Sequence, residues 1–207
     1  MNVSFRPRGW HYRGYLPHFD GGQIAQTVTF RLADSLPEKV LAQWELELVH
    51  MKTREADIER RKRIENYLDR GMGSAWMAAP QIGRVVENAL LYFDGVRYKM
   101  PARVVMPNHV HALLIPLEPF PLEDIIHSWK SFTAKEANRI LKRTGRFWQA
   151  EYFDRYIRDG KHYLAAVDYI EQNPVKAGLC HTPEEWPFSS ARIRALEYAG
   201  RMPALPE

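Results

Sequence analysis

The segment YKMPARVVMPNHVHALLI, residues 98–115, holds two runs rich in apolar and β-branched residues on either side of Pro107-Asn108. Proline and asparagine together favour a tight turn. The pattern therefore predicts two strands, at about residues 98–106 and 109–115, that pair as a hairpin.

Further elements are predicted on both sides of this hairpin. Before it we expect a strand at 27–32, helices at 35–50 (N-cap Ser35) and 52–70, and a helix from residue 80 to about 94. After it we expect a helix at 122–141, an extended stretch at 147–158 and a helix at 161–173 that Pro174 ends. This order predicts an α+β fold in which helices cover one face of a mainly antiparallel sheet.

The composition is that of an ordinary globular chain. Of its 207 residues, 45% are hydrophobic and 26% are charged, which excludes the disordered and fibrous classes and favours one domain. The single cysteine, Cys180, excludes disulfide scaffolds and multi-thiolate zinc fingers. Because the sequence has no run of about 18 apolar residues and no signal-peptide pattern, we expect a soluble, cytoplasmic protein.

The chain divides into three predicted parts. Residues 1–22 form an irregular arm rich in basic and aromatic residues, residues 23–192 form the single domain, and residues 193–207 form a tail. A densely charged helical insertion is expected at about residues 52–75. Its basic run, Arg60-Arg61-Lys62-Arg63, is either a solvated helix face or a contact to a phosphate backbone.

The distribution of charge points to a polyanionic partner. The formal net charge is +4, and between residues 128 and 160 basic side chains outnumber acidic ones and alternate with Trp, Phe and Tyr. Cations suit phosphates and flat rings suit unstacked bases, so this segment indicates binding of a single nucleic-acid strand. A solvated helix face followed by an aromatic core strand explains the same pattern equally well.

His109 and His111 are candidate metal ligands. They are two residues apart in a predicted strand, so both imidazoles point to the same face, while Val110 and Ala112 point to the core. Two neutral imidazoles make two-thirds of a metal site. The alternative is a pair of satisfied surface histidines.

The predicted helix at 161–173 offers a third ligand and a reacting group. At about 100° per residue, His162, Tyr169 and Asn173 form one polar stripe beside the apolar face. Tyr169 and Asn173 are one turn apart, so a metal bound by the amide would lie near the phenol. Alternatively, Tyr169 is an amphipathic core residue and Asn173 caps the helix before Pro174.

A tyrosine beside a bound cation suits the cleavage of a phosphodiester. The cation neutralises the non-bridging oxygens. The phenol, whose pKa is ordinarily about 10, becomes a nucleophile once the cation and nearby arginines favour the phenolate. The products are a phosphotyrosine and a free hydroxyl, and reversal onto a new hydroxyl gives strand transfer without external energy.

Four motifs, in order, resemble those of the REP-associated tyrosine transposases, single-tyrosine HUH endonucleases of the Y1 transposase superfamily. They are MPNHVH (106–111), WQ (148–149) with YFDRYIRD (152–159), YIEQNPVKAGL (169–179) and WPFSS (186–190). The likeness runs from about residue 27 to residue 192.

The resemblance implies a ferredoxin-like sandwich with a helical insertion, in which residues 23–192 form one Y1-transposase-like domain. It implies that His109 and His111 bind a divalent metal ion, Mg²⁺ or Mn²⁺, that Asn173 is the third metal ligand, and that Tyr169 is the catalytic nucleophile. The residues that it implies for DNA binding are Lys130, Arg155, Arg158 and Lys176.

The implied activity is nicking and strand transfer of single-stranded hairpin DNA, a palindromic repeat, through a covalent 5′-phosphotyrosine. This activity implies DNA transposition at the nucleoid, with the arm before Thr27 as a candidate contact to the hairpin foot. The alternative is a domesticated hairpin-binding module with little or no cleavage. A histidine-triad nucleotide hydrolase is disfavoured, because Leu113 stands where a third alternating histidine is needed. Monomer and homodimer both stay open.

Overall fold

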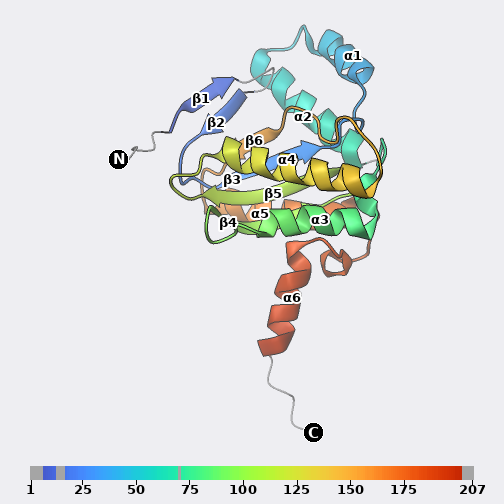
Figure 1. Ribbon diagram of the computed structural model, residues 1–207. Coiled ribbons are helices and arrows are strands. Elements are labelled where there is room, and N and C mark those ends of the chain that lie inside the picture. Colours follow the sequence, from blue (N-terminus) through green and yellow to red (C-terminus); the bar gives the residue numbers. More distant parts are fainter. Residues whose placement is uncertain (1–6, 13–16, 70, 202–207) are drawn as a thin grey trace.

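The computed structural model describes residues 7–12, 17–69 and 71–201. Its main sheet has the strand order β4-β5-β3-β6, and each neighbouring pair is antiparallel (Figure 1). The strands are β3 (Gln26–Arg31), β4 (Tyr98–Val105), β5 (His109–Pro116) and β6 (Phe153–Tyr156). The predicted hairpin is thus formed by β4 and β5.

Two helices connect these strands in the manner of a ferredoxin-like sandwich. α3 (Pro80–Leu91) lies between β3 and β4, and α4 (Leu122–Ile140) lies between β5 and β6. The resulting order is β-α-β-β-α-β. The fold is therefore α+β with a mainly antiparallel sheet, as the sequence predicted.

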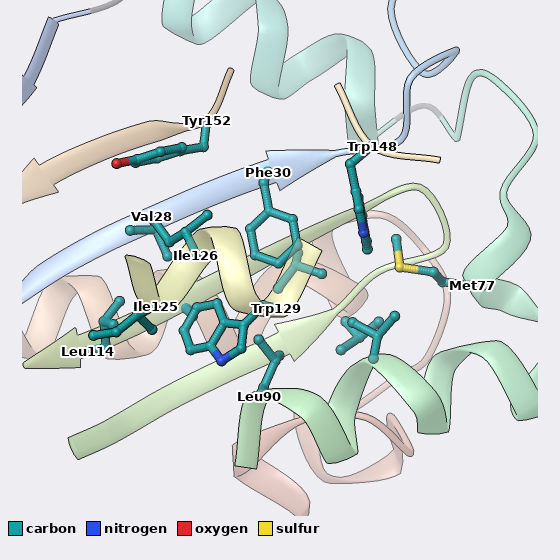
Figure 2. Packing of buried hydrophobic residues seen from close by; sticks show 14 of the residues in the cluster. Val28, Phe30, Met77, Leu90, Leu114, Ile125, Ile126, Trp129, Trp148 and Tyr152 are labelled. Atoms are coloured by element: carbon teal, nitrogen blue, oxygen red, sulfur yellow. The ribbon is translucent and has the colours of Figure 1, made fainter. Parts of the chain in front are cut away.

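The larger core lies between the sheet and the pair α3 and α4 (Figure 2). Val110, Ala112 and Leu114 of β5 are buried in it, because alternate residues of a strand point to the same face. Trp129 of α4 is also buried there, and its indole N–H donates to the Tyr98 hydroxyl at 3.0 Å.

α5 (Gly160–Lys176) packs against the opposite face of the sheet. Its Ile170 lies in one buried cluster with Val104 and Leu113. The prediction that helices cover one face holds for α3 and α4 and needs correction for α5. The reason is that the residues of β4 and β5 that point away from α3 and α4 are also partly apolar. These residues must be buried as well, and α5 buries them.

Two predicted helix ends differ from the structure. Pro174 lies inside the last turn of α5 instead of ending it, and its carbonyl accepts the Leu179 N–H at 2.9 Å just beyond the helix. Ser35 does not cap α1 (Glu38–Leu48); its hydroxyl donates to the Leu32 carbonyl at 2.8 Å, and the N-cap is Pro37.

α2 (Thr53–Asp69) lies where the helical insertion was predicted, after α1 and before the short helix η1 (Trp76–Ala78). Although α2 is densely charged, one side of it carries the buried residues Ile64 and Leu68. They form a small cluster with Leu36, against which Phe153 of β6 packs. The insertion therefore has its own small core beside the main sheet.

Regular structure occurs in both terminal segments. Within the predicted arm, where residues 1–6 and 13–16 lie outside the described residues, β1 (Gly9–Tyr12) pairs with β2 (Pro17–Asp20). η2 (Pro183–Glu185) and α6 (Ser190–Arg201) follow α5. Strands of four residues are too short for their alternation to be read from sequence.

None of the described helices has the length and apolar character of a membrane span.

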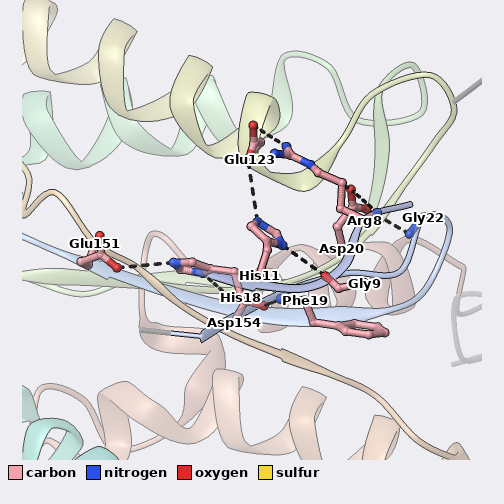
Figure 3. Close-up of polar contacts among 10 residues, drawn as sticks. All are labelled: Arg8, Gly9, His11, His18, Phe19, Asp20, Gly22, Glu123, Glu151 and Asp154. Atoms are coloured by element: carbon pink, nitrogen blue, oxygen red, sulfur yellow. Dashed lines mark hydrogen bonds and ion pairs between the residues drawn. The ribbon is translucent and has the colours of Figure 1, made fainter. Parts of the chain in front are cut away.

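The β1–β2 hairpin is anchored to β6 by a buried cluster around His18 (Figure 3). His18 Nδ1 lies 2.5 Å from Asp154 Oδ1, and its Nε2 lies 3.4 Å from Glu151 Oε2. The other Asp154 oxygen accepts the backbone N–H of Phe19 at 2.8 Å. Burial alone would lower the pKa of His18, but the bonds to Asp154 and Glu151 outweigh it and the pKa is raised.

We expect the hairpin to loosen as the pH rises. Because the pKa of His18 is higher in the folded state, its stabilisation is complete below the ordinary value of about 6.5 and is lost as the pH passes the raised value. Hydrogen-exchange protection of the Phe19 amide should fall across that window. His18→Gln, which cannot titrate, should show no such fall; the same fall in both proteins would contradict the assignment.

Candidate active site

The two histidines of β5 lie side by side on the face of the sheet that α5 covers. His109 is fully buried, His111 is 3% exposed, and their ring centroids are 4.6 Å apart. Both point the same way because they alternate with Val110 and Ala112. Their burial does not fit the alternative of two surface histidines.

Each imidazole is held through its Nδ1 atom. His109 Nδ1 lies 2.7 Å from Asn108 Oδ1, and His111 Nδ1 lies 2.7 Å from Thr29 Oγ1. Thr29 stands directly opposite His111 in the β3–β5 register. Contacts of this kind orient metal-binding histidines and leave Nε2 as the nitrogen that binds the ion.

Burial keeps both imidazoles neutral at ordinary pH. It lowers the pKa of His111 to about 3, with a further contribution from the positive charge of Lys176. Burial also lowers the pKa of His109 well below its ordinary value, and the nearby His111 adds to this effect. Neutral imidazole is the form that binds metal, so both side chains are ready for an ion without losing a proton.

Tyr169 lies on α5 next to His111. The two ring centroids are 5.5 Å apart, and the rings meet edge to face at 75°. The Lys176 ammonium lies 4.8 Å from the centre of the Tyr169 ring. The structure thus brings the tyrosine to the histidine pair, with a cation beside its ring.

Asn173 offers the oxygen that a third metal ligand requires. The residue is 1% exposed, and its Nδ2 donates to the Tyr169 carbonyl at 3.0 Å. Its Oδ1 is buried and accepts no hydrogen bond from any described residue. A buried acceptor without a partner is costly, and a cation would relieve that cost. Asn173 is not the helix cap, because α5 continues to Lys176.

The donor set fits a divalent cation. No group of three or more His, Cys, Asp or Glu residues suited to a metal occurs in the described part of the chain. A metal site here would have to add an amide oxygen, such as that of Asn173, to the imidazoles of His109 and His111. Two imidazoles and one amide oxygen, completed by water, are compatible with Mn²⁺ or Mg²⁺.

A cavity of about 330 Å³ is lined by Tyr169 and His111 together with residues of β3, β6 and α2. His162 lines it about two helical turns before Tyr169 on the same face of α5, and Ala165 and Ala166 line it between them. The cavity has the size of a small-ligand pocket. Tyr169 and His111 both line its wall.

Three of the four candidate DNA-binding cations lie at or near this cavity. Arg155 is exposed and lines it, and Lys176 lies beside Tyr169. Arg158 is exposed, and its backbone N–H donates to His162 Nδ1 at 3.3 Å. Lys176 thus places positive charge beside the tyrosine, while Arg155 lies at the cavity and Arg158 is next to His162.

Lys130 lies apart from the other three. It belongs to α4, on the opposite face of the sheet, and lines a second cavity of about 220 Å³ with His18 and Glu123. Its ammonium donates to the Ala150 carbonyl at 2.7 Å. The structure does not bring Lys130 to the cavity of Tyr169.

Two features of the site escape sequence reasoning. Thr29 contacts His111 only because of the β3–β5 register, and the predicted strand at 27–32 contains the residue without indicating its partner. Ile64, Glu65 and Leu68 of α2 line the cavity through tertiary packing alone. In the sequence, the apolar residues Ile64 and Leu68 within a charged helix are the one sign that α2 packs against the rest of the protein.

A family model matches the part of the chain that holds the candidate site. Residues 91–173 match the family model described as "Transposase IS200 like" (Y1_Tnp), and this range includes the histidine pair, Tyr169 and Asn173. This part of the chain is therefore similar to the Y1, or IS200-like, transposases.

The particular relatives are REP-associated tyrosine transposases, so the predicted resemblance is confirmed. The REP-associated tyrosine transposase of Escherichia coli (strain K12) is 30% identical over 93 residues, which cover 45% of this chain and 54% of that protein. A putative REP-associated tyrosine transposase of Haemophilus influenzae (strain ATCC 51907 / DSM 11121 / KW20 / Rd) is 29% identical over 107 residues, covering 45% and 58%. The chain spans little more than half the length of these relatives.

The fold is also found in a solved structure of a REP-associated tyrosine transposase bound to a REP hairpin. The TM-score is 0.54 at 19% identity, and the match covers 93% of this chain and 88% of the other. This similarity concerns the fold, and it agrees with the α+β sandwich described above.

Proposed function

We propose that the protein is a metal-dependent endonuclease and strand transferase that acts on single-stranded hairpin DNA through a covalent 5′-phosphotyrosine at Tyr169. The observation that carries the proposal is the Tyr169 ring, 5.5 Å from the His111 ring at a cavity open to substrate. The relationship to Y1 transposases supports the same reaction class. The relative that was solved with a REP hairpin supports hairpin DNA as the substrate class.

The reaction would proceed by transesterification at one phosphate. The Tyr169 oxygen attacks the phosphorus, a tyrosine–phosphate bond forms, and the bond from phosphorus to the 3′ oxygen breaks, releasing a 3′ hydroxyl that takes up a proton. A Mg²⁺ or Mn²⁺ ion held by His109, His111 and Asn173 would neutralise the non-bridging oxygens. Attack by the 3′ hydroxyl of another strand end on the same phosphorus releases Tyr169 and completes the transfer.

Positive side chains would hold the strand in place. Arg155 lines the cavity, Arg158 is bonded through its backbone to the cavity residue His162, and Lys176 lies beside Tyr169. These three side chains would contact phosphates on either side of the scissile bond. Lys130, on the other face of the sheet, would contact a more distant part of the hairpin. These contacts orient the phosphate toward the Tyr169 oxygen, which is the role that binding energy plays in such a reaction.

A covalent adduct assay tests the proposal. The protein is incubated with labelled single-stranded hairpin DNA and Mn²⁺, and a protein–DNA species that survives denaturation is sought on a gel. A metal-dependent adduct supports the enzyme. Tight hairpin binding without an adduct in Mg²⁺ or Mn²⁺ would overturn it in favour of a domesticated binding module.

Hairpin binding should weaken steeply with salt. On a single strand the logarithm of the affinity falls by about 0.7 per logarithmic unit of salt for each phosphate contacted. Arg155→Ala should reduce the slope by about that amount, whereas Arg139→Ala, which removes an exposed cation on α4, should leave it unchanged. Fluorescence anisotropy across a salt series measures the slopes. An unchanged slope in Arg155→Ala would remove that residue from the phosphate contacts.

Metal binding should resist mild acid. Protons compete with a metal only near the pKa of the ligand, and burial lowers that of His111 to about 3. We therefore expect the affinity for Mn²⁺ to stay nearly constant down to about pH 5, where ordinary histidines with a pKa of about 6.5 are protonated. Calorimetric titration at several pH values measures it. A sharp loss of affinity between about pH 7 and about pH 6 would contradict neutral, buried ligands.

A further inference from the structure

Asn108 lies in the turn between β4 and β5, and all of its polar side-chain atoms are bonded inside the protein. The residue is 1% exposed. Its Oδ1 lies 2.7 Å from His109 Nδ1, and its Nδ2 donates to the Leu68 carbonyl and to the Met72 carbonyl, both at 3.0 Å. One side chain thus joins the candidate metal ligand to the end of α2.

The hydrogen-bond network fixes the orientation of the Asn108 amide. The Leu68 and Met72 carbonyls can only accept hydrogen bonds, so the group that faces them is the NH₂ of Asn108. The amide oxygen therefore faces His109, and it can only accept. Consequently His109 carries its proton on Nδ1, and the lone pair that binds a metal lies on Nε2.

The same amide connects this tautomer to the wall of the cavity. Leu68 is buried at the end of α2, and together with Ile64 and Glu65 it lines the cavity of Tyr169. The backbone of Asn108 is itself fixed, since its carbonyl accepts the Leu32 N–H at 2.8 Å. A movement of the end of α2 would therefore pull on the residue that orients His109.

We propose that Asn108 is a positioning residue that holds His109 in its metal-binding tautomer and at the same time fixes α2 as a wall of the substrate cavity. The role rests on the proposed function, because it assumes that His109 binds the cation. This role would connect α2 to the site, because the position of α2 and the orientation of His109 both depend on the side chain of Asn108.

Two substitutions separate the two bonds. Asn108→Ala removes both the acceptor to His109 and the donors to α2. Asn108→Asp keeps an acceptor for His109 and places a carboxylate oxygen against the Leu68 and Met72 carbonyls, so that the contact to α2 is lost. Asn138→Ala is the matched control, because Asn138, near the end of α4, makes a similar side-chain bond to the Gly145 carbonyl, at 2.9 Å, in an exposed setting.

The first measurement needs neither metal nor substrate. The ¹⁵N chemical shifts of the His109 ring distinguish the two neutral tautomers, and we expect the Nδ1–H form in the wild type and in Asn108→Asp, and a mixture in Asn108→Ala. Hydrogen exchange at the C-terminal end of α2 should become faster in both Asn108 variants and stay unchanged in Asn138→Ala. A wild-type His109 with its proton on Nε2 would overturn the proposal.

The second measurement is the affinity for Mn²⁺ at a temperature where every variant is folded. Loss of an outer-shell partner typically weakens metal binding about 10- to 100-fold, so we expect that loss in Asn108→Ala, with Asn108→Asp within about threefold of the wild type. A purely structural role would lower thermal stability and leave the affinity unchanged, and that result would overturn the proposal. If the wild type itself binds no Mn²⁺ while His109 keeps the Nδ1–H tautomer, the proposed function fails and the tautomer assignment stands.

Discussion

Tyr169→Phe should form no covalent adduct with hairpin DNA and should cleave it at least about 10⁴-fold more slowly than the wild type, since the loss of a nucleophile removes the whole covalent pathway. Phenylalanine preserves the ring, and with it the contacts to His111 and Lys176. Hairpin affinity should therefore stay within about threefold. Rates from denaturing gels and affinities from anisotropy measure the two effects.

The matched control for this substitution is Tyr163→Phe. Tyr163 lies on the same helix, α5, and packs partly buried in the cluster around Ile170. It should lose neither adduct formation nor binding. If the adduct persists in Tyr169→Phe and disappears in Tyr163→Phe, the nucleophile is Tyr163, and the assignment to Tyr169 is wrong.

His111→Gln should abolish metal-dependent cleavage while hairpin binding in a chelator persists. The change removes one imidazole ligand at similar side-chain size. Loss of a residue that only hydrogen-bonds to a ligand typically weakens metal binding about 10- to 100-fold. We expect the loss of a ligand itself to weaken Mn²⁺ binding by about 100-fold or more. Cleavage should fall in parallel. Titration with Mn²⁺ and adduct formation at each metal concentration measure both.

His127→Gln is the control for this second substitution. His127 is exposed on α4, on the opposite face of the sheet. It should bind Mn²⁺ as the wild type does. Equal metal affinity in His111→Gln and the wild type would show that the ion binds elsewhere, and the catalytic role of the histidine pair would then be lost.

The elements that surround the site were predictable from sequence because their signals are local. Pro107-Asn108 between two apolar runs indicated the β4–β5 hairpin, and strand alternation placed His109 and His111 on one face. Helical spacing placed Tyr169 and Asn173 on one stripe. That Tyr169 meets His111 follows from α5 packing on the second face of the sheet, which local patterns do not determine.

The remaining features depend on contacts between residues far apart in the chain. His18 reaches Asp154 across 136 positions, and Asn108 reaches Leu68 across 40. Such pairs leave no periodicity in a single sequence. Lys130 is another case in which a local pattern did not reveal tertiary packing. It lies in a basic, aromatic segment, and that pattern gave no indication that α4 lies on the face of the sheet away from Tyr169.

The most direct test of the account is to locate the DNA attachment within the adduct. Wild-type protein, Mn²⁺ and a single-stranded hairpin are allowed to react, the adduct is digested with protease and nuclease, and the modified peptide is sequenced by mass spectrometry. We expect a nucleotide joined through its 5′ phosphate to Tyr169. A nucleotide on any other residue, or cleavage that leaves a free 5′ phosphate with no protein attached, would contradict it.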